Sequence, residues 1–469
     1  MPCLARLSAI RSSSESVIDS VAFGVTAGRR VRQCWALCMA WAYCCCAALA
    51  WEAPSVPSAV SAELGAELDK GDAVGLGKWL RTKLADDLSR GVLPGQFISD
   101  RNRVQLLLLH RFMSAFPPEE MQAVFATPRG RQFIREVICE ESAVKGIWAL
   151  VPSDGKARAW KPGTLDVWVE LWSKQGASER RKFALLGAAC ASALGGKGIK
   201  DRAGNPLDPF ATYAWFRRMA EQGNALVPLE KLNFDECFVL ISAPRSLVEM
   251  DYMRKTTKPK MARWNTVAVN CWRIKYTRFN KEGVSVQRGN EFYNGQPQTV
   301  DVLEREGGVC GAISNFGVAA CRAFGVPATT VSQPGHCAFV WLGPDFKWQL
   351  GNDVHGWSDT ASTGDGISGP GKLNPWGVKG DWLRVVERLR AAPASTQKAE
   401  LFMAAAECFT GPARTRLLEQ ASLECDFHPS PWMLLVKDAA PADRPKLLEK
   451  ARVKLKGYPQ CATDILSPH

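Results

Sequence analysis

The sequence predicts an α+β fold in which helical regions lie before and after one compact group of short strands. Apolar residues recur at helical spacing through residues 63–255 and again through residues 381–469. Between these regions, three short apolar runs are separated by the turn-forming segments Gln333-Pro334-Gly335 and Gly343-Pro344-Asp345. The chain has 469 residues, of which 46% are hydrophobic and 23% are charged. This composition is typical of globular proteins, and the length is enough for about two to four domains.

The first 50 residues have the pattern of an export signal. Arginines at positions 29, 30 and 32 precede an apolar run from Cys34 to Ala50, which ends in the cleavage-like pattern Ala48-Leu49-Ala50. The run of about 17 residues is short for a membrane-spanning helix. Residues 1–50 are therefore interpreted as either a signal peptide or an N-terminal anchor. We expect the protein outside the cytoplasm, periplasmic or secreted, or else anchored in the membrane.

Residues 51–62 are rich in Pro and Ser and are interpreted as a linker to a helical region spanning residues 63–255. A core helix is predicted at Leu106 to Phe116, and helix-start signals occur at Pro117-Pro118, Thr127-Pro128, Asp208-Pro209 and Ser246-x-x-Glu249. Trp168 and Trp172 lie one helical turn apart, so we expect both in the core, with a sugar-binding surface as the alternative.

The segment from Gly307 to Asp353 carries the residues with catalytic chemistry. Apolar residues recur at helical spacing after Cys310, and Gly325 and Pro327 then stop the pattern, which predicts a helix with Cys310 at or just before its first turn. A helix N-terminus favours a thiolate, and the glycines at 307, 308 and 311 let the backbone turn sharply and leave the sulfur accessible. Cys321 lies about three turns further along, where core packing is expected.

Strands are predicted at residues 328–331, 336–342 and 346–350. Antiparallel pairing of the last two would place His336, which begins one strand, near Asp353, which follows the next. Together with Cys310 these residues supply a nucleophile, a base and an orienting carboxylate. Cys310, His336 and Asp353 are therefore the predicted catalytic residues. His355 is a rival base, although its position after the aspartate is more typical of a solvated loop.

This arrangement resembles the transglutaminase-like superfamily of cysteine enzymes, which have a papain-like core. The matching motifs are Gly308-Val309-Cys310-Gly311, the run Cys321 to Ala328, Gly335-His336-Cys337-Ala338 and Asn352-Asp353. The resemblance covers residues 265–360 and implies that Cys310, His336 and Asp353 hold the family's catalytic positions. The gap between Cys310 and His336 is tight, so the resemblance implies reduced substrate-binding loops. The Cys310 backbone N–H is one predicted oxyanion donor. Gln296 and Gln298 lie upstream, and nothing local selects either as the second donor.

The predicted reaction is acyl transfer from an amide of a peptide or protein through a thioacyl intermediate. Water as the acceptor would give a protease or amidase, and an amine would give a transamidase. No cofactor is predicted, and the absence of a Cys-x-x-Cys pair argues against a zinc-binding branch of the superfamily. The alternative function is a catalytically inactive binding or scaffold protein that uses its helical regions. A glycan-processing envelope protein, suggested by the 17 tryptophans, is a third hypothesis.

Residues 361–380 are interpreted as a Gly-rich loop, which either covers the site or is a plain surface loop. The region 381–469 contains an internal repeat, in which Leu417 to Pro429 matches Leu447 to Pro459. Its period is typical of a tetratricopeptide-like helical array, and two similar amphipathic helices are the alternative. This region is the predicted site for a protein partner or for self-association.

The formal net charge is +12, and no basic–aromatic nucleic-acid motif accompanies it. We therefore expect no nucleic-acid partner. A solvated basic surface is expected, with weak attraction to anionic envelope polymers as the more specific alternative.

Overall fold

The computed structural model describes residues 57–89, 94–140, 143, 162–196, 199–357, 361–362 and 380–458. The expected signal or anchor at residues 1–50 lies outside these residues, as do half of the linker, most of the Gly-rich loop expected at residues 361–380 and the last residue of the second repeat copy. Residues from Ala53 onward form one compact unit. Among the described helices, none combines the length and the apolar character needed to cross a membrane.

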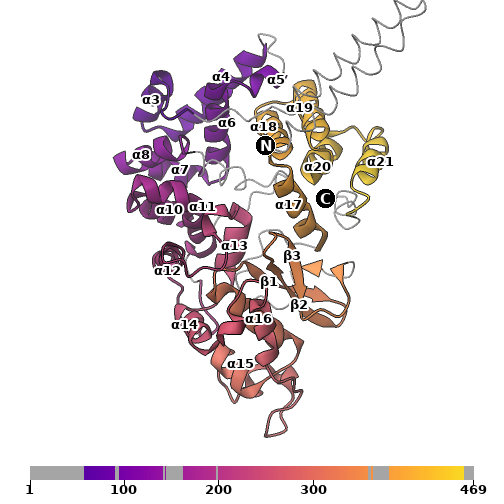
Figure 1. Ribbon diagram of the computed structural model, residues 1–469. Helices are drawn as coiled ribbons and strands as arrows, with labels where there is room; N and C mark the ends of the chain where they lie inside the picture. The colour runs from indigo at the N-terminus through magenta and orange to yellow at the C-terminus, as the bar shows by residue number, and fades with distance from the viewer. Residues whose placement is uncertain are drawn as a thin grey trace, which may run out of the picture. The chain divides into compact units, whose positions relative to one another are not determined.

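The fold is α+β, mostly helical with one small antiparallel sheet (Figure 1). The N-terminal helices are α3 (Ala62–Asp69), α4 (Ala73–Ser89), α5 (Pro94–Phe97), α6 (Arg101–Ser114), α7 (Pro118–Phe125), α8 (Pro128–Val137), α10 (Thr164–Ser173), α11 (Ala177–Leu194), α12 (Pro209–Glu221), α13 (Phe234–Ser242) and α14 (Leu247–Thr256).

The helix starts in this region follow their capping signals. The Thr127 side chain accepts from the Gly130 N–H at the start of α8, and Asp208 accepts from the Phe210 N–H at the start of α12. Each cap satisfies a backbone donor that has no partner inside its helix. Trp168 and Trp172 are each only 2% exposed, which confirms the expectation that both pack in the core.

The central region begins with short 3₁₀ helices and ends with the sheet. Its elements are η2 (Pro259–Met261), η3 (Val267–Arg273), η4 (Val286–Glu291), α15 (Val300–Glu306), α16 (Cys310–Ala323), β1 (Ala328–Gln333), β2 (His336–Leu342), β3 (Trp348–Gly351) and β4 (Ala361–Ser362). Another 3₁₀ helix, η1 (Leu229–Lys231), lies earlier, between α12 and α13. The helix predicted from Cys310 and the three predicted strands are confirmed. Strand β4 lies in the segment predicted to be a loop, and two residues are too few for a recognisable strand periodicity.

The sheet has the strand order β3-β2-β1-β4, and all of its pairs are antiparallel. Strands β1 and β2 form a hairpin whose register runs from Ala328 opposite Trp341 to Gln333 opposite His336. Helix α16 packs on this sheet, and its close approach depends on Gly317, because a Cβ there would lie 2.6 Å from Phe339 Cζ. The side chain of Phe339 therefore faces α16.

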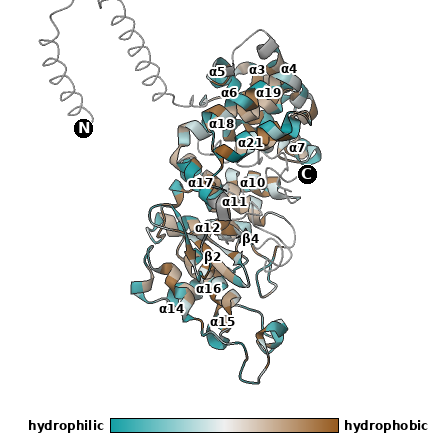
Figure 2. Ribbon diagram, turned by 90° about the vertical axis from the view of Figure 1, so that its right-hand side faces the viewer, coloured by the Kyte–Doolittle hydropathy of each residue, from teal (hydrophilic) through white to brown (hydrophobic). Residues whose placement is uncertain are grey.

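The C-terminal helices are α17 (Gly380–Ala391), α18 (Pro393–Glu407), α19 (Gly411–Glu424), α20 (Pro429–Asp438) and α21 (Arg444–Lys454), and each packs on the next. The first repeat copy spans the end of α19 and the start of α20, whereas the second runs through α21. Helices α6 and α18 lie side by side in Figures 1 and 2. The C-terminal helices therefore pack directly on the N-terminal helices.

Candidate active site at the N-terminus of helix α16

A glycine pair fixes the start of the helix that carries Cys310. Gly307 has φ 78° and Gly308 has φ 156°, both in the region that favours glycine. A Cβ on Gly307 would lie 2.4 Å from the Lys275 carbonyl oxygen. A Cβ on Gly308 would lie 2.5 Å from the Cβ of Ala312. Only glycines fit this turn without displacing their neighbours, so the turn determines where Cys310 begins α16.

Cys310 is the first residue of α16, and its thiol is half-buried and free of disulfide bonding. Among the described residues, no acceptor is found for the backbone N–H groups of Cys310, Gly311 and Ala312. Unpaired N–H groups at a helix N-terminus stabilise negative charge. This end of α16 therefore offers both a thiol and donors suited to a thiolate or an oxyanion.

His336, the first residue of β2, is held by a backbone carbonyl. Its Nε2 lies 2.5 Å from the Asn352 carbonyl oxygen, which requires the tautomer with hydrogen on Nε2 if the ring is neutral. In that tautomer Nδ1 carries a lone pair and is available to accept a proton. The imidazole therefore has one nitrogen fixed and the other in the form that a general base needs.

Asp353 is exposed and folds back on its own loop. Its Oδ1 accepts from Gln333 Nε2 at 2.5 Å and from the backbone N–H groups of His355 and Gly356. Burial alone would raise the pKa of Asp353, but these hydrogen bonds and the positive charge of His336 together lower it. Asp353 and His336 thus interact electrostatically, and no hydrogen bond joins them among the described residues.

Asn352 is the residue at this site whose role the sequence did not indicate. Its side-chain amide donates to the carbonyl oxygens of Cys310 at 3.1 Å and Cys337 at 3.0 Å, and lies 2.9 Å from Ser314 Oγ. Its backbone has φ 49°, a left-handed conformation that asparagine tolerates better than most residues. Asn352 therefore connects the Cys310 helix to His336, through its amide on one side and its carbonyl on the other.

The structure does not join the predicted triad by hydrogen bonds. Among the described residues, none links the Cys310 thiol to His336. Since side chains alternate along a strand, Cys337 faces α16 with Phe339, and His336 belongs to the opposite face of β2. Burial first, and then the neighbouring Cys310, raises the pKa of the Cys337 thiol to about 12. The catalytic roles of Cys310, His336 and Asp353 stay predictions, and His355 lies exposed in the following loop.

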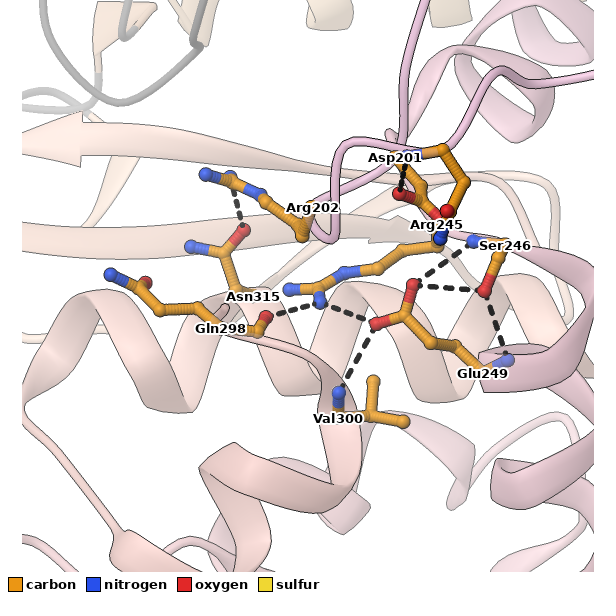
Figure 3. A network of polar contacts seen from close by, with 9 residues as sticks. Asp201, Arg202, Arg245, Ser246, Glu249, Gln298, Val300 and Asn315 are labelled. Atoms are coloured by element: carbon orange, nitrogen blue, oxygen red, sulfur yellow. Dashed lines mark hydrogen bonds and ion pairs between the residues drawn. The ribbon is translucent and has the colours of Figure 1, made fainter. Parts of the chain in front are cut away.

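Gln298 is the better placed of the two upstream glutamines. The Gln296 side chain is exposed and accepts from Arg305, whereas the Gln298 backbone carbonyl is fixed by Arg245 at 2.8 Å. Figure 3 shows the side-chain ends of Gln298, Asn315 and Arg202 directed to the same side of the polar network. Asn315 in turn donates to the Gly311 carbonyl, next to Cys310. Gln298 is therefore part of the polar network that includes Asn315 of α16.

Arg245 and Glu249 form a buried ion pair close to these residues (Figure 3). Arg245 and Glu249 have side chains that are 3% and 5% exposed, and their charged atoms lie 2.8 Å apart. Burial lowers the pKa of the nearby Arg202 and Arg322 to about 10 each, which leaves both charged at neutral pH. A cavity of about 700 Å³ borders this network, and its lining includes Glu249 but none of the three predicted catalytic residues.

The described residues contain no group of three His, Cys, Asp or Glu side chains placed to hold a metal ion. Comparison of the chain with family models, curated proteins and solved structures finds no match.

Proposed function

We propose that the protein is an exported cysteine enzyme of the transglutaminase-like type that acts on an amide of a peptide or protein. The observation that carries the proposal is the free, half-buried thiol of Cys310 on the first residue of α16, beside backbone N–H groups that have no acceptor in the described part of the chain. A thiol in this position combines an accessible nucleophile with stabilisation of negative charge.

In the proposed reaction, the Cys310 thiol transfers its proton to Nδ1 of His336, and the sulfur attacks the amide carbonyl carbon. The resulting oxyanion is stabilised by the Cys310 backbone N–H and by the Gln298 amide. Collapse of this intermediate breaks the C–N bond, and His336 returns the proton to the leaving amine. Water or a second amine then attacks the thioester and releases Cys310. Because His336 belongs to the face of β2 opposite α16, the first transfer requires the His336 ring to move toward the Cys310 thiol when substrate binds.

Labelling with an electrophilic, amide-like thiol probe tests the nucleophile. The wild type should be labelled at Cys310, and Cys310→Ala should lose the label while its circular dichroism stays unchanged. His336→Ala should slow labelling by roughly 10²-fold or more, because the base is lost. Undiminished labelling of the Cys310→Ala protein would contradict the proposal.

Two other half-buried cysteines provide matched controls. Burial raises the pKa of the Cys139 thiol to about 11 and that of Cys408 to about 12, so both remain protonated at neutral pH. Cys139→Ala and Cys408→Ala should therefore keep the full extent and rate of labelling.

The second candidate is a binding protein without catalysis, and one observation favours it: no hydrogen bond joins Cys310 to His336. In this case the helical regions act alone, and the C-terminal helices are the proposed contact for a protein partner. Labelling at Cys310 that is slow and independent of His336 would support this function over the enzymatic one. The exported location remains part of both proposals, on the evidence of the apolar run at residues 34–50.

A further inference from the structure

An exposed segment rich in basic and aromatic side chains precedes Cys310 in the chain and contacts Gly308 at the start of α16. Between Asp251 and Glu282 the chain contains nine Lys and Arg residues and no Asp or Glu. The segment ends in six residues that we call the basic–aromatic surface: Trp272, Lys275, Tyr276, Arg278, Phe279 and Lys281.

The three aromatic members are unusually open to solvent. Trp272 is 60% exposed, Tyr276 is 56% exposed and Phe279 is 59% exposed. Aromatic side chains contribute strongly to binding when a partner covers them, and large apolar side chains exposed together mark interaction surfaces. Three such residues within eight positions of the chain therefore indicate a binding surface rather than scattered exposed residues.

The three cations of the surface are exposed as well. Lys275, Arg278 and Lys281 make no ion pair or side-chain hydrogen bond with the described part of the chain, and only Glu282 follows immediately. Arg273, by contrast, is paired with Glu304 at 2.6 Å and packs over the Phe316 ring. The fold therefore neutralises the cation that faces α16 and leaves the outer cations uncompensated.

Contacts with α16 and with the glycine pair before it place the basic–aromatic surface near the predicted nucleophile, Cys310. Along α16, Cys271 lies against Gly317, and Arg273 stacks on Phe316 one residue nearer the N-terminus. Further on, the Gly308 N–H donates to Lys275, and the Thr277 N–H donates to Gly308, two residues before Cys310. Figure 1 shows this part of the chain close to α15 and α16, away from the C-terminal helices.

We propose that the basic–aromatic surface binds an acidic, aromatic-containing peptide segment of the substrate and delivers its amide to Cys310. Charge complementarity selects an acidic segment, and the aromatic side chains select apolar or aromatic groups within it. The choice of a peptide over another polyanion rests on the proposed function, because the surface adjoins a thiol suited to amide chemistry.

The test measures binding in a protein that cannot react. A fluorescently labelled copolymer of glutamate and tyrosine is titrated into the full chain carrying Cys310→Ala, and fluorescence anisotropy is recorded. Combining Lys275→Glu, Arg278→Glu and Lys281→Glu should weaken binding by about tenfold or more, and added salt should reduce the difference. Combining Trp272→Ser, Tyr276→Ser and Phe279→Ser should weaken binding at every salt concentration.

A matched control reverses three exposed lysines on or after α21, Lys446, Lys450 and Lys456, which changes the net charge by the same amount. This control should bind like the parent. Equal losses in the two charge-reversed proteins, or tighter binding of single-stranded DNA or anionic vesicles than of the copolymer, would overturn the proposal. Copolymer binding is measured without the thiol and labelling without the copolymer, so failure of this surface and failure of the proposed chemistry are distinguishable.

Discussion

Asn352 holds together three segments that meet at the candidate site. Its amide contacts backbone carbonyl oxygens on α16 and on β2, and its own carbonyl accepts from His336. Cys337 is only 3% exposed, and its carbonyl also accepts from Ser314 Oγ at 2.8 Å. Loss of one such hydrogen bond costs about 0.5–1.5 kcal/mol.

Replacement of Asn352 should therefore affect both stability and chemistry. Asn352→Ala should lower the free energy of unfolding by about 1–3 kcal/mol, because the Cys310 and Cys337 carbonyls each lose one hydrogen bond and alanine resists the left-handed backbone. Urea denaturation measures the loss, and probe labelling of Cys310 at a temperature where the variant is folded measures the effect on the site.

Asp353→Ala is the matched control, since this residue is adjacent in sequence but exposed. Its replacement should cost less than half as much stability, while slowing labelling if its charge supports the His336 cation. Equal destabilisation by the two substitutions would show that the loop, rather than the Asn352 amide, holds the segments together.

At this scale the sequence indicated Cys310 and His336 correctly as the first residues of a helix and a strand. Both predictions depend on glycine spacing and on the alternation of apolar residues, which are local patterns that a sequence shows directly. The contacts of Asn352 depend on one residue with φ 49° and on atoms up to 42 positions away. A carboxylate is the expected partner of a catalytic histidine, so the sequence pattern favoured Asp353 over Asn352.

Among the elements, Glu249 links the N-termini of two helices. Its carboxylate accepts from the Ser246 N–H in the capping box of α14 and from the Val300 N–H at the start of α15. It also pairs with Arg245, which donates to the Gln298 carbonyl. The capping box could be recognised from Ser246-x-x-Glu249 alone. The contact with Val300 could not, because 51 positions separate the two residues.

Removal of the Glu249 charge should lower the free energy of unfolding, because the carboxylate contacts the N-termini of both α14 and α15. Glu249→Gln keeps a hydrogen-bonding side chain but leaves Arg245 buried without its counter-ion, and breaking a buried ion pair costs about 3–5 kcal/mol. Ser246→Ala removes only the cap and should cost about 1 kcal/mol. Chemical denaturation compares the two variants. A loss for Glu249→Gln no larger than that for Ser246→Ala would mean that capping, and not charge, dominates at this position.

At the scale of the whole compact unit, the N-terminal and C-terminal helices share one packed interface. The sequence predicted two separate helical regions, at residues 63–255 and 381–469, because periodicity identifies the face that a helix buries but not its partner. In the structure Phe97 packs edge-on against Phe409, with ring centroids 6.4 Å apart. The buried Arg111 of α6 faces Glu407 of α18 at 3.6 Å. The C-terminal helices are thus part of the same core and not an appended module.

Loss of the Glu407 carboxylate should therefore loosen both regions together. Glu407→Ala breaks the ion pair with Arg111, whose side chain is 2% exposed, and loss of this buried contact should cost about 3 kcal/mol. Hydrogen–deuterium exchange should then rise in α6 as well as in α18, because opening either side of the interface exposes the other. Glu419→Ala, on the exposed face of α19, is the control and should leave exchange in both helices unchanged. Faster exchange confined to α18 would show that the C-terminal helices open as an independent unit, and that the contact between α6 and α18 contributes little to the stability of the fold.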